Sequence, residues 1–165
     1  MEKYCVFRSD LLSGTDVAAD LVSAKVFDAD GNEIAVENGV IIKLMGYLEG
    51  EREVMKAVLA EAGDDMKDCA IVGTPEVHYD ERKKNLDEFV NEAGSIVRAY
   101  IPRSRNMYSV TAEGFVDKTV PVSTGAEATV GIGANGKLDT AATGWGTVEA
   151  IEVVGRYTYY LIKIA

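Results

Sequence analysis

The sequence predicts a mainly β protein of α+β class, in which short strands form a barrel or sandwich and one amphipathic helix lies near residues 80–94. Three observations support this class. Short apolar segments recur between turn signals rich in glycine, asparagine and aspartate, as in barrels and sandwiches. β-Branched and aromatic residues dominate the C-terminal segment 147–164. Apolar residues follow clear helical spacing in one segment, which lies within 80–94.

Length and composition agree with this class. The 165 residues suit a single compact domain spanning 1–165. A chain that is 47% hydrophobic and 27% charged has ordinary globular composition and can bury a core without disulfides or metals. A second arrangement stays open, in which two small β modules, about 1–75 and 96–165, are joined by the 80–94 helix.

The balance of charge argues against two classes of partner. The formal net charge is −10 at pH 7, so the chain repels nucleic acid and anionic membrane surfaces. The simplest interpretation of this charge is that it keeps the protein soluble. A more specific interpretation is that the acidic surface binds a basic partner. No apolar stretch reaches the length of a membrane span, and the first residues lack the apolar run of a signal peptide.

The two cysteines, Cys5 and Cys69, lie far apart and outside any C-x-x-C pair. This spacing predicts reduced, partly buried thiols in a protein made in the cytoplasm. A single disulfide between them is the alternative.

In the first half of the chain, strands are expected at 4–7, 24–27, 34–36, 40–44 and 69–72. The Asp-Gly and Gly-Asn pairs within 28–33 supply the positive φ of tight turns, so strands 24–27 and 34–36 should form a hairpin. Residues 52–59 fit a helix as well as a strand. We favour a strand there because both neighbours are strands.

The predicted helix begins with Asp80 as its N-cap. Its apolar stripe consists of positions i, i+3, i+4 and i+7, namely Leu86, Phe89, Val90 and Ala93. Gly94 stands where a residue of left-handed conformation often ends a helix. Leu86, Phe89 and Val90 are therefore expected in the core.

After this helix, short strands are expected at 95–100, 108–111, 119–122 and 129–132, and longer ones at 147–154 and 156–164. Gly155 marks a turn or bulge between the last two. Both faces of the final strand are largely apolar, which predicts burial on both sides. We expect this strand to close a barrel and one face to meet another copy of the chain, with Tyr157 and Tyr159 as interface candidates.

Trp145, the only tryptophan, is flanked by Gly144 and Gly146. An exposed tryptophan between glycines can bind a partner. It can equally cap the core. Trp145 is therefore a third interface candidate.

Motifs that suggest chemistry are each better explained as structure. Residues 131–136 match G-x-G-x-x-G, but no helix is expected after them, so a glycine-rich turn is predicted in place of a nucleotide site. Residues 28–33 resemble part of a calcium loop but lack its third ligand, and a hairpin turn explains them better.

Two further features could carry chemistry. The acidic loop 61–68 could hold a cation weakly, although a solvated loop is the better interpretation. His78 lies near Glu76, Asp80 and Glu81 but without a second histidine or a nucleophile motif. No catalytic, cofactor or metal site is therefore predicted, and a non-enzymatic protein is expected.

Three stretches carry a resemblance to a known family. They are 4–8 with 13–15; then 75–86, continuing through 91–94 and 108–113; and finally 151–162. Together they resemble virion structural proteins of phages and prophages of Gram-positive bacteria. The last stretch also resembles the closing strands of capsid decoration proteins.

The resemblance implies a capsid decoration, or cement, protein that binds the assembled head. The implied partners are the major capsid protein or other virion proteins, and the implied location is the virion, after synthesis in the bacterial cytoplasm. Another virion part, such as a tail or head-fibre component, ranks lower. The alternative from a different class is a small-molecule or carbohydrate-binding β module.

Overall fold

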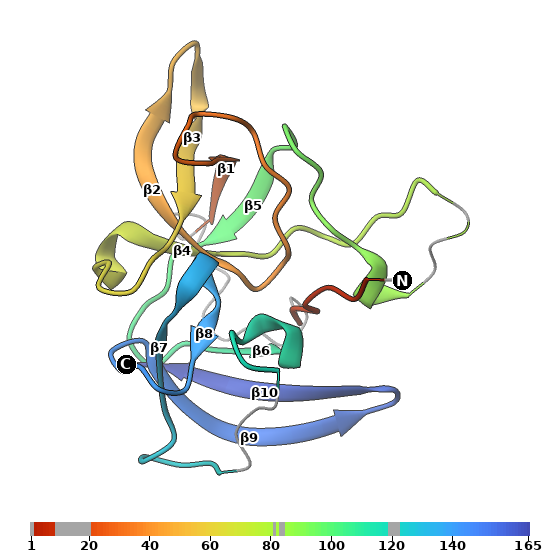
Figure 1. Cartoon of the computed structure of the whole chain (residues 1–165), viewed down its shortest axis with the longest axis vertical. Helices are drawn as coiled ribbons and strands as arrows, with labels where there is room; N and C mark the ends of the chain where they lie inside the picture. The colour runs from red at the N-terminus through yellow and green to blue at the C-terminus, as the bar shows by residue number, and fades with distance from the viewer. Residues whose placement is uncertain (1, 9–20, 81, 83–84, 119–122) are drawn as a thin grey trace.

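The computed structural model describes residues 2–8, 21–80, 82, 85–118 and 123–165 and confirms a mainly β fold. The strands form two sheets. The first five strands form a closed barrel, and the last five form a five-stranded sheet. In the view of Figure 1 the barrel lies above the sheet, and the long β9–β10 hairpin forms the lower edge. The predicted strand at 119–122 lies outside the described residues.

The barrel is built from β1 to β5 in the order β1-β3-β2-β4-β5. The strands are β1 (Leu21–Phe27), β2 (Ile41–Leu48), β3 (Glu51–Leu59), β4 (Cys69–Val72) and β5 (Val97–Tyr100). β1 and β3 pair in parallel, all other pairs are antiparallel, and β5 returns to β1 to close the barrel. The 52–59 segment is thus a strand, as favoured from its neighbours.

Small side chains fill the barrel because five strands enclose little space. Its buried residues are alanines and valines with one isoleucine: Ala24, Val26, Val36, Val40, Ile42, Ala57, Ala70, Val72, Val97 and Ala99. The turn between β1 and the 33–36 stretch is tight, with Gly31 at φ 84° and a bridge between Phe27 and Glu33. This confirms the predicted turn at 28–33, but the predicted partner strand 34–36 does not form: only single bridges occur there, at Glu33 and Val36.

The second sheet has the order β6-β10-β9-β7-β8. Its strands are β6 (Met107–Val110), β7 (Thr129–Ile132), β8 (Leu138–Asp139), β9 (Gly146–Val154) and β10 (Tyr157–Ile164). β9 and β10 form a hairpin that turns at Gly155, where φ is 62°. The prediction that the C-terminal strand closes a barrel is wrong: β10 lies between β6 and β9 in this separate sheet.

The main core lies between the barrel and the sheet. Neighbouring residues of one barrel strand serve different cores, because side chains alternate along a strand: Ile42 faces the barrel interior, whereas Ile41 joins the core shared with the sheet. In β4, Ala70 points inward and Ile71 joins the shared core. β5 belongs to the barrel, so the division between the two sheets falls after Tyr100.

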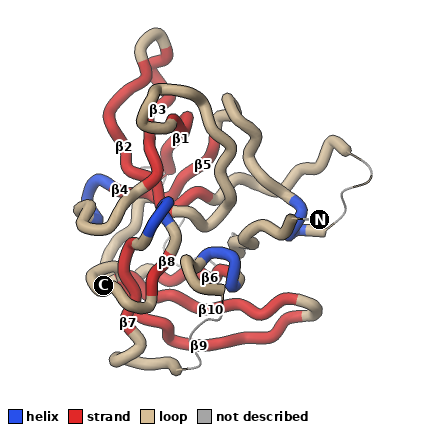
Figure 2. The backbone as a smooth tube through the Cα atoms, in the orientation of Figure 1, coloured by secondary structure: helices blue, strands red, loops and turns tan. Residues whose placement is uncertain are grey.

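The predicted helix at 80–94 is not present in the described residues. Figure 2 shows only short helical turns, and the one in this region is the 3-10 turn η4 (Leu86–Glu88). Asn85 and Glu88 form a capping box that starts the turn. Asn91 then pairs with Val36 through two backbone hydrogen bonds of 2.9 and 3.0 Å, so a β-bridge replaces the helix.

Because the helix does not form, the side chains of the predicted apolar stripe are not buried together. Leu86 is 41% exposed, and Phe89 and Val90 are half-buried, so the expectation that these three lie in the core is wrong. Asp80 accepts hydrogen bonds from the backbone and side chain of Arg82. Gly94 does take a positive φ of 83°, but in a turn closed by the hydrogen bond from the Ser95 amide to the Glu92 carbonyl.

Candidate interaction surface

The N-terminal segment, residues 2–8, lies along the edge of β6. Phe7 forms an antiparallel bridge with Val110. The Arg8 amide donates to the Ser109 carbonyl at 3.1 Å, and the Thr111 amide donates to the Val6 carbonyl at 3.2 Å. The predicted strand at 4–7 is therefore reduced to a single bridge at Phe7, with flanking backbone hydrogen bonds that hold the segment against β6.

Glycines make room for this segment. A Cβ atom at Gly39 would lie 2.8 Å from the Cys5 sulfur, and one at Gly114 would lie 2.9 Å from it. At Gly73 a Cβ would lie 2.6 Å from the Phe7 ring. These glycines come from the barrel side and from the loop after β6, so the two halves of the fold together form the site that holds the segment.

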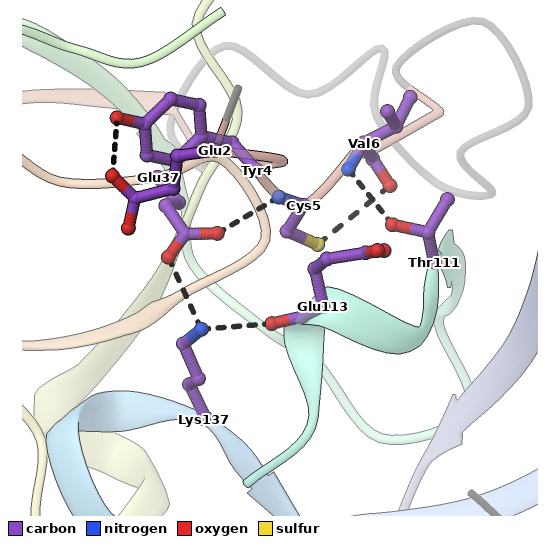
Figure 3. A network of polar contacts seen from close by, with 8 residues as sticks. All are labelled: Glu2, Tyr4, Cys5, Val6, Glu37, Thr111, Glu113 and Lys137. Carbon is purple, nitrogen blue, oxygen red and sulfur yellow. Dashed lines mark hydrogen bonds and ion pairs between the residues drawn. The ribbon is translucent and has the colours of Figure 1, made fainter. Parts of the chain in front are cut away.

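A polar network fixes the segment to both sheets, as Figure 3 shows. The Cys5 amide donates to Glu37 Oε2 at 2.8 Å. The other oxygen of Glu37 lies 3.1 Å from Lys137 Nζ, which also donates to the Glu113 carbonyl at 2.9 Å. Burial, followed by the nearby charge of Glu37, raises the pKa of the Cys5 thiol to about 12. Both cysteines are free, as expected from their spacing.

The N-terminal segment, the loop before η4 and the end of the β9–β10 hairpin enclose a shallow groove of about 380 Å³, here called the interface groove. Its lining consists of Val6, Phe7, Arg8, Glu76, Leu86, Val154, Tyr157 and Tyr159. Val154 is 45% exposed and Leu86 41%, so the rim presents apolar side chains to solvent. Val153, next to Val154, is 75% exposed.

Aromatic and charged groups interact with one another in and beside the interface groove. The Arg8 guanidinium lies 5.2 Å from the centroid of the Tyr159 ring, and the Arg156 guanidinium 5.4 Å from that of Tyr157, within the range of cation–π attraction. Asp87, which is buried, accepts at 3.4 Å from both Arg156 and the Tyr157 hydroxyl. The hairpin end is thereby tied to η4.

The structure brings two of the three sequence-predicted interface residues to this groove. Tyr157 is half-buried on its wall, and Tyr159 is only 4% exposed. Trp145 lies elsewhere: it is 1% exposed, so its place is the core, the second of the two interpretations that its glycine neighbours left open. Glycine neighbours do not imply exposure here, since Gly146 approaches the Lys163 backbone closely.

Sequence reasoning did not single out the other residues of the interface groove. Periodicity places Leu86 on a helix that does not form, and Val154 lies in a strand whose exposure the sequence does not reveal. All eight lining residues fall within three stretches of the sequence, namely 4–8 with 13–15, 75–86, and 151–162. Residues 13–15 of the first stretch lie outside the described residues.

The motifs interpreted as turns have the geometry of turns. Residues 131–136 end β7 and form the 3-10 turn η6 (Ala134–Gly136) before β8, so no helix follows the glycines. Asp28 accepts hydrogen bonds from the amides of Asn32 and Asp30, and the first of these is the main cause of its lowered pKa.

The carboxylates of the acidic loop 61–68 also interact with groups of the protein itself. Asp64 pairs with Lys43 at 2.7 Å, which lowers the pKa of this carboxyl, and Asp65 caps the 3-10 turn η3 (Met66–Asp68). Among the described residues, no group of three or more histidine, cysteine, aspartate or glutamate side chains is arranged to hold a metal ion.

Comparisons of the chain with protein-family models, with curated proteins and with solved structures find no match. Within the described part of the chain, no helix has the length and apolar character needed to cross a membrane.

Proposed function

We propose that the chain is a structural protein of a tailed-phage virion, of the capsid decoration type, and that it binds the assembled head through the interface groove. One observation carries the proposal. The three stretches that resemble virion proteins are separated by dozens of residues in the sequence, yet each contributes to the lining of this one groove.

The chemistry of the groove suits binding between proteins. Its rim exposes Leu86 and Val154, and its lining includes Tyr157 and Arg8, whose guanidinium lies over the Tyr159 ring. Aromatic residues and arginine are the types enriched at protein interfaces. A groove of this size buries little area, so affinity for the shell comes from many copies that bind a repeated surface.

The test uses particles of the phage or prophage whose genome encodes the chain. Purified heads should contain many copies of it, and heads stripped of it with mild denaturant should bind the recombinant protein again. Val154→Asp should weaken this binding at least tenfold, because it places a charge on the apolar rim. Val116→Asp is the matched control, since Val116 is 46% exposed but lies outside the groove.

Absence of the chain from purified particles would overturn the proposal. Recovery in tails alone would assign it to another virion part. Equal binding by the two aspartate variants and the unmodified protein would remove the interface groove from the contact with the head.

A further inference from the structure

The second half of β9 has an open edge on the side away from β10. β7 pairs with β9 only at Gly146 and Thr147, and the turn at 125–128 bonds the backbone of Val148. Among the described residues, none forms a backbone hydrogen bond to this side of β9 at 149–154. In Figure 1 the strand is the outer one of the hairpin, along the lower edge of the molecule. We call the stretch 149–154 the β9 edge.

The backbone of the β9 edge offers hydrogen bonds to a further strand. Val154 pairs with Tyr157 across the turn at 155–156, and the closing pair of such a tight hairpin exchanges hydrogen bonds. Because the direction alternates along a strand, the N–H and C=O groups of Val153 and Ile151 point away from β10. A β-strand is the partner that fits such an edge.

The side chains of the β9 edge are apolar and exposed. Val153 is 75% exposed, Val154 45% and Ile151 37%. The stretch contains neither lysine nor proline, the residues that commonly keep an open edge from pairing. Ile151 lies beside Tyr160 of β10, whose ring packs edge-on against Phe115 with centroids 5.4 Å apart. A strand added at this edge would therefore extend an apolar surface that is continuous with the core.

The order of residues along the β9 edge suits pairing with itself. When two copies of one strand pair antiparallel, opposed side chains share a face of the sheet, so one residue must lie opposite its own copy. With Glu152 at that position, two carboxylates would oppose each other, which is unfavourable. With Ile151 there, the two isoleucines meet, Val153 opposes Glu149 of the second copy, and Glu152 opposes Ala150.

The remaining two-fold registers form shorter ladders. A register centred on Ala150 would bring the second copy against Val148, whose backbone is already bonded to the turn at 125–128. A register centred on Val153 would run into Gly155, where φ is 62° and the chain turns. The register centred on Ile151 therefore gives the longest ladder in which no carboxylate opposes another.

We propose that the β9 edge pairs antiparallel with the β9 edge of a second copy, around a two-fold axis at Ile151. Tyr160 and Ile151 of each copy then form one apolar row across the two hairpins. The two chains, each with net charge −10, repel each other as wholes, so added salt should strengthen the dimer. This pairing does not depend on the proposed role in the virion.

Disulfide trapping tests the register. The Cα atoms of the two copies of residue 151 should lie about 5.5 Å apart, within the range of a disulfide. Ile151→Cys should therefore form a covalent dimer under mild oxidation. Val153→Cys is the control: Val153 is more exposed, but its two copies should lie about 14 Å apart, so this variant should stay monomeric on a denaturing gel. Cys5 and Cys69 are buried and should not react.

Lysine at the same two positions separates strand pairing from net charge. Ile151→Lys places two like charges opposite each other at the axis and should weaken the dimer at least tenfold. Val153→Lys adds the same charge but places it opposite Glu149 of the second copy, so its dimer should be at least as strong as that of the unmodified protein. Analytical ultracentrifugation of the full-length proteins measures both, and circular dichroism should show native strand content in each.

Any of three results would overturn the proposal. The unmodified protein could remain monomeric at millimolar concentration in high salt. The two cysteine variants could cross-link equally, which would show collision or another register. The two lysine variants could weaken the dimer equally, which would place the contact between copies away from the β9 edge or in a different register.

Discussion

The indole nitrogen of Trp145 donates a hydrogen bond of 2.7 Å to the hydroxyl of Tyr108, and both side chains are 1% exposed. Trp145 directly precedes β9, and Tyr108 belongs to β6 at the other edge of β10. The bond therefore spans the sheet within the core. Burial raises the pKa of the Tyr108 hydroxyl, which keeps it neutral in the folded protein.

Replacing Tyr108 by phenylalanine should lower the free energy of unfolding by about 1–3 kcal/mol, because it leaves the buried indole N–H without its acceptor. Urea unfolding followed by tryptophan fluorescence measures this directly, since Trp145 is the only tryptophan. Tyr47→Phe is the control: Tyr47 is 73% exposed, so its loss should leave stability unchanged. Equal stability of the two variants would show that the bond contributes nothing.

Most strands could be predicted from the sequence, because alternating or β-branched runs between glycine turns directly encode a pleated strand. The 80–94 segment could not. Its helical spacing is real, but the buried side chain of Asn91 donates to the Val36 carbonyl at 2.9 Å and to Asn38 at 3.1 Å. These partners are more than 50 residues away in the sequence, so local periodicity carries no sign of them.

The candidate surfaces were predicted less well than the fold. Aromatic content identified Tyr157 and Tyr159, which do line the interface groove. Their neighbours Val6, Phe7 and Arg8 join them only because the N-terminal segment pairs with β6, a contact across about 100 residues. Gly39, Gly73 and Gly114 permit that contact, and a sequence alone does not show which side chain a glycine makes room for.

Glu37 should be important for the placement of the N-terminal segment. Glu37→Ala leaves the Cys5 amide without its acceptor and Lys137 without its ion pair, and we expect a loss of about 1–3 kcal/mol in the free energy of unfolding. Glu37→Gln keeps an oxygen for the amide, so it should lose less. Denaturant unfolding of both variants tests this ranking, and an equal loss in the two would assign the whole effect to the ion pair.

Gly136 should be essential for contact between the second sheet and the barrel. Its φ is 71°, and a Cβ atom there would collide with the Ile41 carbonyl oxygen of β2. Gly144 has a φ of 101° but open space around it. Gly144→Ala should therefore cost only the backbone strain, about 1–2 kcal/mol, whereas Gly136→Ala should cost clearly more. Thermal unfolding of the two variants gives the comparison, and equal melting temperatures would contradict the packing argument.

The Cys5 thiol should make the protein lose stability in alkali. Its pKa is about 12 in the folded protein against an ordinary value of 9.0, because burial disfavours the thiolate. Between these values the unfolded chain releases the thiol proton while the folded protein retains it. The contribution of Cys5 is thus fully present below pH 9 and is lost as pH rises toward 12, at a rate approaching about 1.4 kcal/mol per pH unit.

Urea unfolding under reducing conditions from pH 8 to 10.5 should show a shallower decline in the free energy of unfolding for Cys5→Ala than for the unmodified protein. Cys69 is present in both proteins, so its own titration cancels in the comparison. Parallel declines would mean that the Cys5 thiol ionises as easily in the folded protein as in the unfolded chain, which is incompatible with its burial between β6 and the barrel.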